Sequence, residues 1–340
     1  MTHSPAPAGS VASPPAPSPA SAPSSPPAVL HASQDSALVA GLSFRNRIVL
    51  AAGTAGYGEE VDDVLDLSRL GGIATKAVSV EPRHGARPLR VSEFAGGMIN
   101  AIGLANPGLK DVQRTALPWL ARHHAGTRVI VNVVGNSVDD FDTVVSGLDA
   151  ERGVDAFELN VSCPNVKAGG LEFGADPAAL DALVRRVRTR TTRPVFVKLS
   201  PTLGAGIVDA ARVAHDAGAD GFTLVNTMPG LVIDTGRRAP KIGFGTGGVS
   251  GPALLPFGVL ATWRVSRALP GVPIIGLGGV STGADAVQYL MAGASLVGVG
   301  TAALRDPRAP ERIARGLRAW ADAEGVRDLT AIIGTLQWPS

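Results

Sequence analysis

Eight short apolar segments, each followed by a helical or loop segment, constrain the fold of this chain more than any other feature. They lie at residues 46–52, 73–78, 128–134, 156–161, 194–199, 221–226, 273–277 and 295–300. Strands that are apolar throughout and alternate with helices are typical of a parallel sheet buried on both faces. The expected helices lie at 61–70, 176–189, 206–217, 254–268 and 283–292. Eight strands are the number that closes a (β/α)8 barrel.

The positions of the polar residues favour this α/β TIM barrel over an open, doubly wound sheet. A polar residue or glycine stands at the C-terminal end of nearly every strand: Lys76, Asn132, Asn160, Lys198, Asn226, Gly278 and Gly300. In a barrel these ends converge on one mouth. In an open sheet only the strands beside the switch point would contribute.

Composition limits the domain organisation and the class of partner. Residues 1–35 are almost entirely Ala, Pro and Ser, so we expect a disordered leader there and a single barrel domain over 36–340. The net charge of +2 implies no polyanion partner, and one cysteine excludes an intrachain disulfide and a thiolate metal cluster. No apolar run is long enough to span a membrane, and no secretory signal is present. We therefore expect a cytoplasmic protein without a bound metal.

The loop after the fourth strand holds the single cysteine, Cys163, between Asn160 and Asn165. A thiol becomes a useful acid or base where neighbouring groups tune it, and two carboxamides can orient a planar polar ligand. A lone cysteine is more often a small buried core residue, and that alternative remains open on this loop alone.

Three glycine-rich segments predict a phosphate site. They are 247–251, Gly278-Gly279 after the seventh strand and 298–301 after the eighth. Loops after the last two strands of a barrel often bind phosphate through backbone N–H groups, although glycine also ends strands for steric reasons. Ser281-Thr282 can cap the helix that follows.

Lysines and asparagines predict a pocket for a flat anionic ligand. Lys76 and Lys198 lie within apolar strands, where a buried ammonium needs either a structural ion pair or an anionic ligand. Asn100 lies in an apolar loop at 98–108 that we expect to fold over the mouth. Together with Asn132, Asn160, Asn165 and Asn226 it describes a pocket for an imide or amide ligand such as a pyrimidine.

The order of these motifs resembles the dihydroorotate dehydrogenases from about residue 40 to about 335. The resemblance rests on Lys76-Ala77, Asn-Ala-Ile-Gly-Leu at 100–104, Asn-Val-Ser-Cys-Pro-Asn at 160–165, Val-Lys-Leu-Ser-Pro at 197–201, Asn226-Thr227, Thr-Gly-Gly-Val-Ser-Gly-Pro at 246–252, Ile-Ile-Gly-Leu-Gly-Gly at 274–279 and Gly-Val-Gly-Thr at 298–301. It implies a (β/α)8 barrel with one FMN at the C-terminal mouth, and oxidation of dihydroorotate to orotate in pyrimidine biosynthesis.

The resemblance also implies a role for each matching residue. Cys163 is expected to be the catalytic base, and Lys198 to lie beside the flavin N1 and O2 atoms. The substrate-binding residues it implies are Lys76, Asn100, Ala101, Ile102, Gly103, Leu104, Asn160, Asn165, Asn226 and Thr227. The FMN-binding residues it implies are Ala52, Lys76, Ala77, Asn132, Asn160, Lys198, Val225, Gly251, Gly278, Gly279, Gly300 and Thr301. Ala52 stands where the family often has serine, so only a backbone contact to FMN is expected there.

A cysteine base resembles the soluble class 1 enzymes, and the motifs look most like class 1B. That class implies a homodimer of barrels within a heterotetramer, with a partner subunit that carries FAD and an iron–sulfur cluster and passes electrons to NAD. The alternatives are a fumarate-using class 1A enzyme, a related FMN-dependent dihydropyrimidine or tRNA-uridine oxidoreductase, and an FMN-binding module without activity. The low net charge disfavours tRNA.

Overall fold

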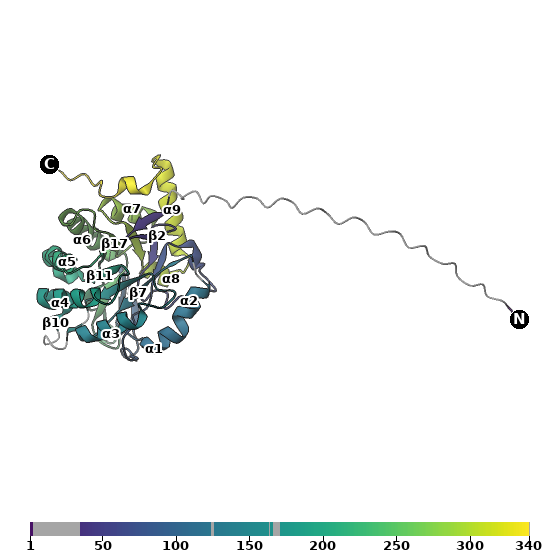
Figure 1. Cartoon of the computed structure of the whole chain (residues 1–340), viewed down its shortest axis with the longest axis horizontal. Coiled ribbons are helices and arrows are strands. Elements are labelled where there is room, and N and C mark those ends of the chain that lie inside the picture. The colour runs from purple at the N-terminus through teal and green to yellow at the C-terminus, as the bar shows by residue number, and fades with distance from the viewer. Residues whose placement is uncertain (3–34, 124–125, 163, 166–170, 340) are drawn as a thin grey trace. The chain divides into compact units, whose positions relative to one another are not determined.

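A closed barrel of eight parallel strands forms the centre of the fold (Figure 1), as the sequence predicts. The computed structural model describes residues 1–2, 35–123, 126–162, 164–165 and 171–339. The chain divides into two units, Met1–His31 and Ala32–Ser340, and only the second is described below. The barrel strands are β3 (Ile48–Leu50), β4 (Gly72–Ala74), β7 (Arg128–Val133), β8 (Ala156–Asn160), β11 (Val195–Leu199), β12 (Gly221–Leu224), β17 (Ile274–Leu277) and β18 (Leu296–Val299). Seven of them lie within segments predicted from the sequence, and β4 begins one residue before the predicted segment 73–78.

Helices surround the barrel, and their first turns explain where several of them begin. Asp176 accepts hydrogen bonds from the N–H groups of Ala178 and Ala179 and so caps α4. Thr282 and Asp285 form a capping box that begins α7, which confirms the predicted cap. The helices are α1 (Leu109–Asp111), α2 (Leu117–His123), α3 (Val138–Leu148), α4 (Pro177–Arg188), α5 (Ile207–Asp216), α6 (Leu255–Ala268), α7 (Gly283–Met291), α8 (Thr301–Arg305) and α9 (Ala309–Ala323).

The segment 61–70 is not the helix that its apolar spacing predicts. It holds only the last residue of one short 3-10 turn, Glu59–Val61, and the whole of a second, Leu67–Arg69. Asp66 interrupts the segment, because its carboxylate accepts a hydrogen bond from the N–H of Ser68 at 3.0 Å and thereby begins the second turn. This local bond competes with the backbone bonds of a continuous helix.

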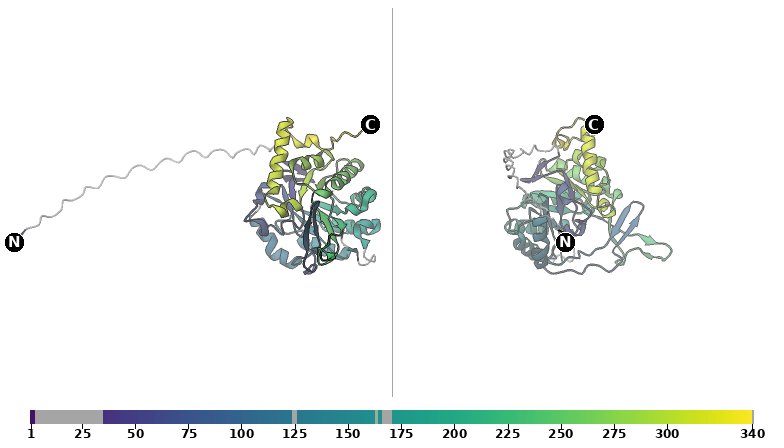
Figure 2. Two further views of the ribbon diagram at one scale, coloured as in Figure 1. Left: turned by 180° about the vertical axis from the view of Figure 1, so that it is seen from behind. Right: turned by 90° about the vertical axis from the view of Figure 1, so that its right-hand side faces the viewer.

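A small antiparallel sheet extends beyond the barrel (Figure 2, right). Its strands run in the order β13 (Met228–Gly230), β16 (Gly247–Ser250), β6 (Gly97–Asn100) and β5 (Val91–Phe94). The sequence predicts a loop from residue 98 and a glycine-rich turn from residue 247. Both predictions are wrong, because each segment begins as a strand of this sheet. Two short hairpins complete the strands: β14 (Ile233–Asp234) with β15 (Ala239–Pro240), and β9 (Pro164–Asn165) with β10 (Leu171–Glu172).

The N-terminal end of the barrel is closed by a hairpin of β1 (Ala37–Val39) and β2 (Leu42–Phe44). The hairpin contributes Ala37, Val39 and Phe44 to one buried apolar cluster. The same cluster holds a residue from most barrel strands: Val49, Ala74, Ile130, Ala156, Phe196, Ile275 and Leu296. The cluster fills the barrel interior at its N-terminal end. A ligand therefore enters from the opposite, C-terminal mouth.

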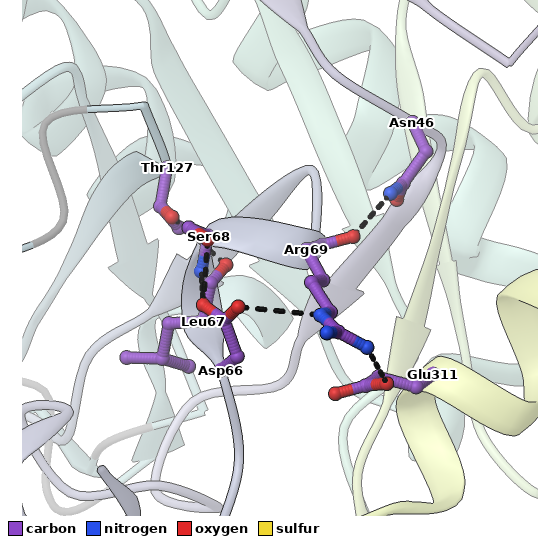
Figure 3. Close-up of polar contacts among 7 residues, drawn as sticks. All are labelled: Asn46, Asp66, Leu67, Ser68, Arg69, Thr127 and Glu311. Atoms are coloured by element: carbon purple, nitrogen blue, oxygen red, sulfur yellow. Dashed lines mark hydrogen bonds and ion pairs between the residues drawn. The ribbon is translucent and has the colours of Figure 1, made fainter.

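A polar network at the same end ties the loop before β4 to distant parts of the chain (Figure 3). Thr127 donates a hydrogen bond to the carbonyl of Leu67 at 2.8 Å, and Asn46 donates one to the carbonyl of Arg69 at 2.7 Å. Arg69 forms ion pairs with Asp66 and with Glu311 of α9, each at 3.2 Å. These side chains stabilise the end of the barrel that lies away from the mouth.

Candidate active site

A cavity of about 610 Å³ opens at the C-terminal ends of the barrel strands. Residues at or just beyond the end of every barrel strand line it. In strand order these are Ala51, Lys76, Asn132, Asn160, Lys198, Asn226, Gly278 and Gly300. The convergence at one mouth that the polar strand ends predict is therefore present. The small sheet forms the other wall, through Val91, Met98, Asn100 and Ser250.

The cavity brings together most of the predicted site residues. It is lined by Ala52, Lys76, Ala77, Asn100, Ile102, Leu104, Asn132, Asn160, Lys198, Val225, Asn226, Thr227, Gly251, Gly278, Gly279, Gly300 and Thr301. Ala101 and Gly103 lie in the same segment but not in the described lining. Cys163 lies outside the described residues, and so does the side chain of Asn165. Their predicted roles stay predictions.

Lys198 is both ion-paired and exposed to the cavity, so the two alternatives for this lysine are compatible. Its side chain is 7 % exposed, and its Nζ lies 3.8 Å from Oε1 of Glu158. Glu158 also accepts hydrogen bonds from Asn132 Nδ2 and from Thr223 Oγ1, each at 2.6 Å. Glu158 thus pairs with the lysine on the side away from the cavity, and Asn132 and Lys198 line the cavity itself.

Three amide side chains at the mouth are held by hydrogen bonds to their neighbours. Asn226 Nδ2 donates to Asn160 Oδ1 at 3.4 Å, and Asn226 Oδ1 accepts from the N–H of Thr227 at 2.8 Å. Asn100 Nδ2 donates to the carbonyl of Gly248 at 3.2 Å, which ties β6 to β16. These bonds fix amide groups that can pair with the N–H and C=O groups of a planar ligand.

Two buried tyrosines hold the backbone of the cavity wall. Tyr289 donates a hydrogen bond to the carbonyl of Gly278 at 2.7 Å, and Tyr57 donates one to the carbonyl of Ala77 at 2.9 Å. Burial raises the pKa of both phenols, so both remain hydrogen-bond donors over the physiological pH range.

The glycine turn after β17 is shaped as a cradle for an anionic group. Gly278 and Gly279 have φ of 126° and 76°, which is the left-handed region that other residues avoid. A Cβ on Gly279 would lie 2.5 Å from the backbone N of Leu255. The turn therefore needs glycine both for its backbone angles and for its approach to α6. A glycine cradle, two lysines and apolar walls fit a flavin mononucleotide, which combines a phosphate with a flat ring.

Several residues of the site carry no assignment from the sequence. Glu158 and Thr223 are the most important, because they lie buried behind Asn132 and Lys198. Glu158 precedes Asn160 by two residues, and residues two apart on a strand point to the same face. That spacing is the signal that could have identified it. Glu60 also lines the cavity, and it lies directly before the segment 61–70 that the sequence predicts as a helix.

The described part of the chain lacks two further features. No group of three or more His, Cys, Asp or Glu side chains with metal-binding geometry occurs in it. Among the same residues, none of the helices has the length and apolar character needed to cross a membrane.

Active sites of (β/α)8 barrels lie at the C-terminal mouth, formed by the loops that follow the strands. The position of the cavity and of its polar groups therefore defines the chain as an enzyme of the barrel class. Comparison with known proteins gives the family. The sequence model described as dihydroorotate dehydrogenase matches residues 36–320, and the chain belongs to this family of oxidoreductases.

Curated relatives match the chain over most of its length. "Dihydroorotate dehydrogenase B (NAD(+)), catalytic subunit" of Cutibacterium acnes is 46 % identical and covers 85 % of this chain and 94 % of its own. "Putative dihydroorotate dehydrogenase A (fumarate)" of Solibacter usitatus is 44 % identical, and the match covers 88 % of this chain and 97 % of the relative. The crystal structure of the Eimeria tenella dihydroorotate dehydrogenase in complex with ferulenol has a TM-score of 0.76 at 25 % identity, and covers 89 % of this chain and 88 % of its own. The predicted family and fold are confirmed.

Proposed function

We propose that the chain oxidises (S)-dihydroorotate to orotate for pyrimidine biosynthesis, with FMN bound in the cavity at the barrel mouth. The observation that carries this proposal is the convergence of two lysines and four asparagines on one cavity of a family member: Lys76, Lys198, Asn100, Asn132, Asn160 and Asn226. When bound, FMN would accept the hydride from C6 of the substrate at its N5 atom.

The residues of the chain supply binding, orientation and proton transfer. Cys163 takes the proton from C5 of dihydroorotate, as the motif at 160–165 predicts. Asn100, Asn160, Asn226 and Lys76 orient the pyrimidine ring and its carboxylate, and their position in the cavity supports this assignment. Much of the remaining lining is apolar, with Val91, Met98 and Leu254 among it, and offers a surface against which a flat ring can pack.

Different parts of the site would hold the two ends of FMN. Lys198 and Asn132 would bind the pyrimidine end of the flavin, and the backbone of Gly278, Gly279 and Gly300 would bind the phosphate. The left-handed backbone of the glycine turn supports the phosphate assignment. Lys198 would supply positive charge beside the flavin ring, which favours the reduced form.

We further propose that the electrons leave through a partner subunit. The names of several relatives describe the catalytic subunit of an NAD-linked enzyme, which supports a partner subunit and NAD as final acceptor. We assign FAD and an iron–sulfur cluster to that partner because the sequence motifs resemble class 1B. The cytoplasmic location that the sequence predicts stays a proposal. Fumarate as direct acceptor is the second candidate, because a relative named for fumarate is 44 % identical.

An anaerobic titration tests both parts of the proposal. The chain is purified alone with its FMN, its visible spectrum is recorded, and L-dihydroorotate is added before fumarate and NAD are offered in turn. We expect the flavin to bleach and neither acceptor to restore its colour. Reoxidation by fumarate would replace the partner with direct use of fumarate. A flavin that dihydroorotate does not bleach would reject the proposed reaction.

A further inference from the structure

Glu158 is a buried carboxylate that the proposed mechanism leaves without a role. It lies in β8, inside the barrel, with 1 % of its surface exposed. Its neighbours along the strand, Phe157 and Leu159, are fully buried apolar residues. Burying a carboxylate is unfavourable unless donors and a counter-charge surround it. A charge at this position therefore calls for an explanation beyond packing.

The partners of Glu158 come from the three barrel strands nearest to β8. Oε1 accepts a hydrogen bond from Asn132 Nδ2 of β7, and Oε2 accepts one from Thr223 Oγ1 of β12, each at 2.6 Å. Nζ of Lys198, on β11, lies 3.8 Å from Oε1. Asn132 and Thr223 are neutral, so the lysine is the cation that balances the carboxylate within this cluster.

The cluster has a direction toward the cavity. Asn132 and Lys198 belong to the cavity lining, whereas Glu158 and Thr223 do not appear in the described part of it. The carboxylate thus lies behind the two residues that face the ligand. It is held by two short hydrogen bonds, and it in turn restrains the ammonium and one amide of the cavity floor.

We propose that Glu158 is a positioning residue that acts through Lys198. Its carboxylate holds the Lys198 ammonium at the floor of the cavity, where the ammonium would stabilise electron density at the pyrimidine end of the flavin. This inference rests on the proposed binding of FMN and on the assignment of Lys198 to that end of the ring. A merely structural Glu158 would support the barrel without affecting the flavin.

Sulfite is a suitable probe because it needs neither dihydroorotate nor an electron acceptor. Its sulfur lone pair forms a bond to N5 of the oxidised flavin, and a ring electron pair moves toward N1 and the C2 carbonyl. The dissociation constant of this adduct, read from the bleaching of the flavin, therefore reports the positive charge near N1. FMN affinity and the unfolding midpoint are measured on the same samples.

Glu158→Gln removes the charge and keeps the shape. The glutamine carbonyl can accept from Asn132, and its amide can donate to Thr223. Without the carboxylate, the Lys198 ammonium loses the ion pair that holds it and moves away from the cavity floor, which removes positive charge from the flavin. We expect sulfite to bind about tenfold more weakly. Moving the ammonium roughly 2 Å away from the flavin, at an effective dielectric constant of about 20, weakens their electrostatic attraction by about that factor. FMN remains bound.

A double-variant cycle separates positioning from a structural role. In a Lys198→Met background, Glu158→Gln should no longer weaken sulfite binding, because the lysine through which it acts is absent. Equal weakening in both backgrounds would overturn the proposal. Unchanged or tighter sulfite binding in the single Glu158→Gln variant would overturn it as well.

Two further variants keep the test decisive. If Glu158→Gln does not fold, Thr223→Val removes one hydrogen bond to the carboxylate without changing the charge, and should weaken sulfite binding in the presence of Lys198 only. Lys198→Met alone tests the proposed function. If sulfite affinity does not respond to it, the assignment of Lys198 to the flavin is wrong. If Lys198→Met weakens binding and the variants around Glu158 do not, only the positioning role fails.

Discussion

Lys198 shows why single residues of this site are hard to assign from sequence. A lysine in an apolar strand predicts either an ion pair or an anionic ligand, and the structure gives it a carboxylate on one side and the cavity on the other. The carboxylate satisfies the ammonium before any ligand binds. This pairing offsets part of the cost of burying the lysine, which still faces the cavity.

Cys163 carries the sharpest prediction at the scale of one residue. Cys163→Ala should keep the yellow FMN and slow flavin reduction by dihydroorotate about 10²- to 10⁴-fold, the usual contribution of a positioned base. Stopped-flow bleaching under anaerobic conditions measures this rate. An ordinary thiol has a pKa of about 8.5, so the wild-type rate should also rise between neutral and alkaline pH.

Ser162→Ala is the matched control for this change. It removes one heavy atom from the adjacent residue, and the buried Oγ of Ser162 has no hydrogen-bond partner among the described residues. The control should reduce its flavin at close to the wild-type rate. If the two variants slow the reaction equally, the loss reflects a disturbed loop, and Cys163 is not the base.

The polar residues that line the cavity were largely predictable from the sequence. The buried residues that hold them in place were not. Asn132, Asn160 and Lys198 stand out because they end apolar strands. Glu158 lies two residues before Asn160, in the middle of the apolar strand β8, where the sequence gives no sign that its side chain supports the cavity. Only the contacts across strands identify its partners, and those contacts join residues up to 65 positions apart.

At the scale of elements, the eight barrel strands were predictable because burial on both faces makes each an apolar run. The small sheet beside the mouth was not. Two of its strands, β6 and β16, begin at glycines and lack the alternation that marks a half-buried strand. They pair with each other across about 150 residues of sequence, Asn100 with Gly248, and no local pattern encodes that pairing.

The glycine turn after β17 gives a prediction for an element. Gly279→Ala should weaken FMN binding and lower stability, because the new Cβ would lie 2.5 Å from the backbone N of Leu255. Fluorescence titration with FMN and thermal unfolding measure the two effects. Backbone cannot move aside as a flexible side chain can, so we expect a loss larger than the roughly 1 kcal/mol of a left-handed alanine.

Gly271→Ala separates the close approach from the backbone strain. Gly271 has φ of 83°, similar to the 76° of Gly279, but a Cβ there would meet nothing within 4 Å. The Gly271→Ala variant should lose about 1 kcal/mol of stability and bind FMN with the affinity of the wild type. Equal FMN affinity in the two variants would argue against a cradle at Gly279.

At the scale of the whole molecule, the barrel has one closed and one open end. The β1–β2 hairpin fills the closed end through Ala37, Val39 and Phe44. Asp35 adds an ion pair with Arg318 of α9, in which Arg318 Nε donates to Asp35 Oδ2 at 3.0 Å. The predicted barrel domain begins at 36 and the family match begins at the same residue, whereas the disorder predicted for residues 1–35 concerns residues that lie mostly outside the described part of the chain.

Two truncations that differ by ten residues test where the folded enzyme begins. A variant that begins at Ala32 keeps Asp35 and the hairpin. The curated Cutibacterium relative matches 94 % of its own length with only 85 % of this chain, so most of the enzyme's sequence lies within that share. We expect this variant to bind FMN, to be bleached by dihydroorotate at the wild-type rate and to unfold at the wild-type temperature.

A variant that begins at Leu42 removes Asp35 and β1, and should behave differently. Ala37 and Val39 leave a void against the apolar floor of the barrel, and the loss of their buried surface lowers the free energy of unfolding by about 3 kcal/mol. Because the floor supports the strands that carry the site, FMN affinity should fall with stability. Equal stability of the two variants in urea would show that the barrel closes without its hairpin. Loss of stability in the variant that begins at Ala32 would instead move the boundary of the folded enzyme into the leader.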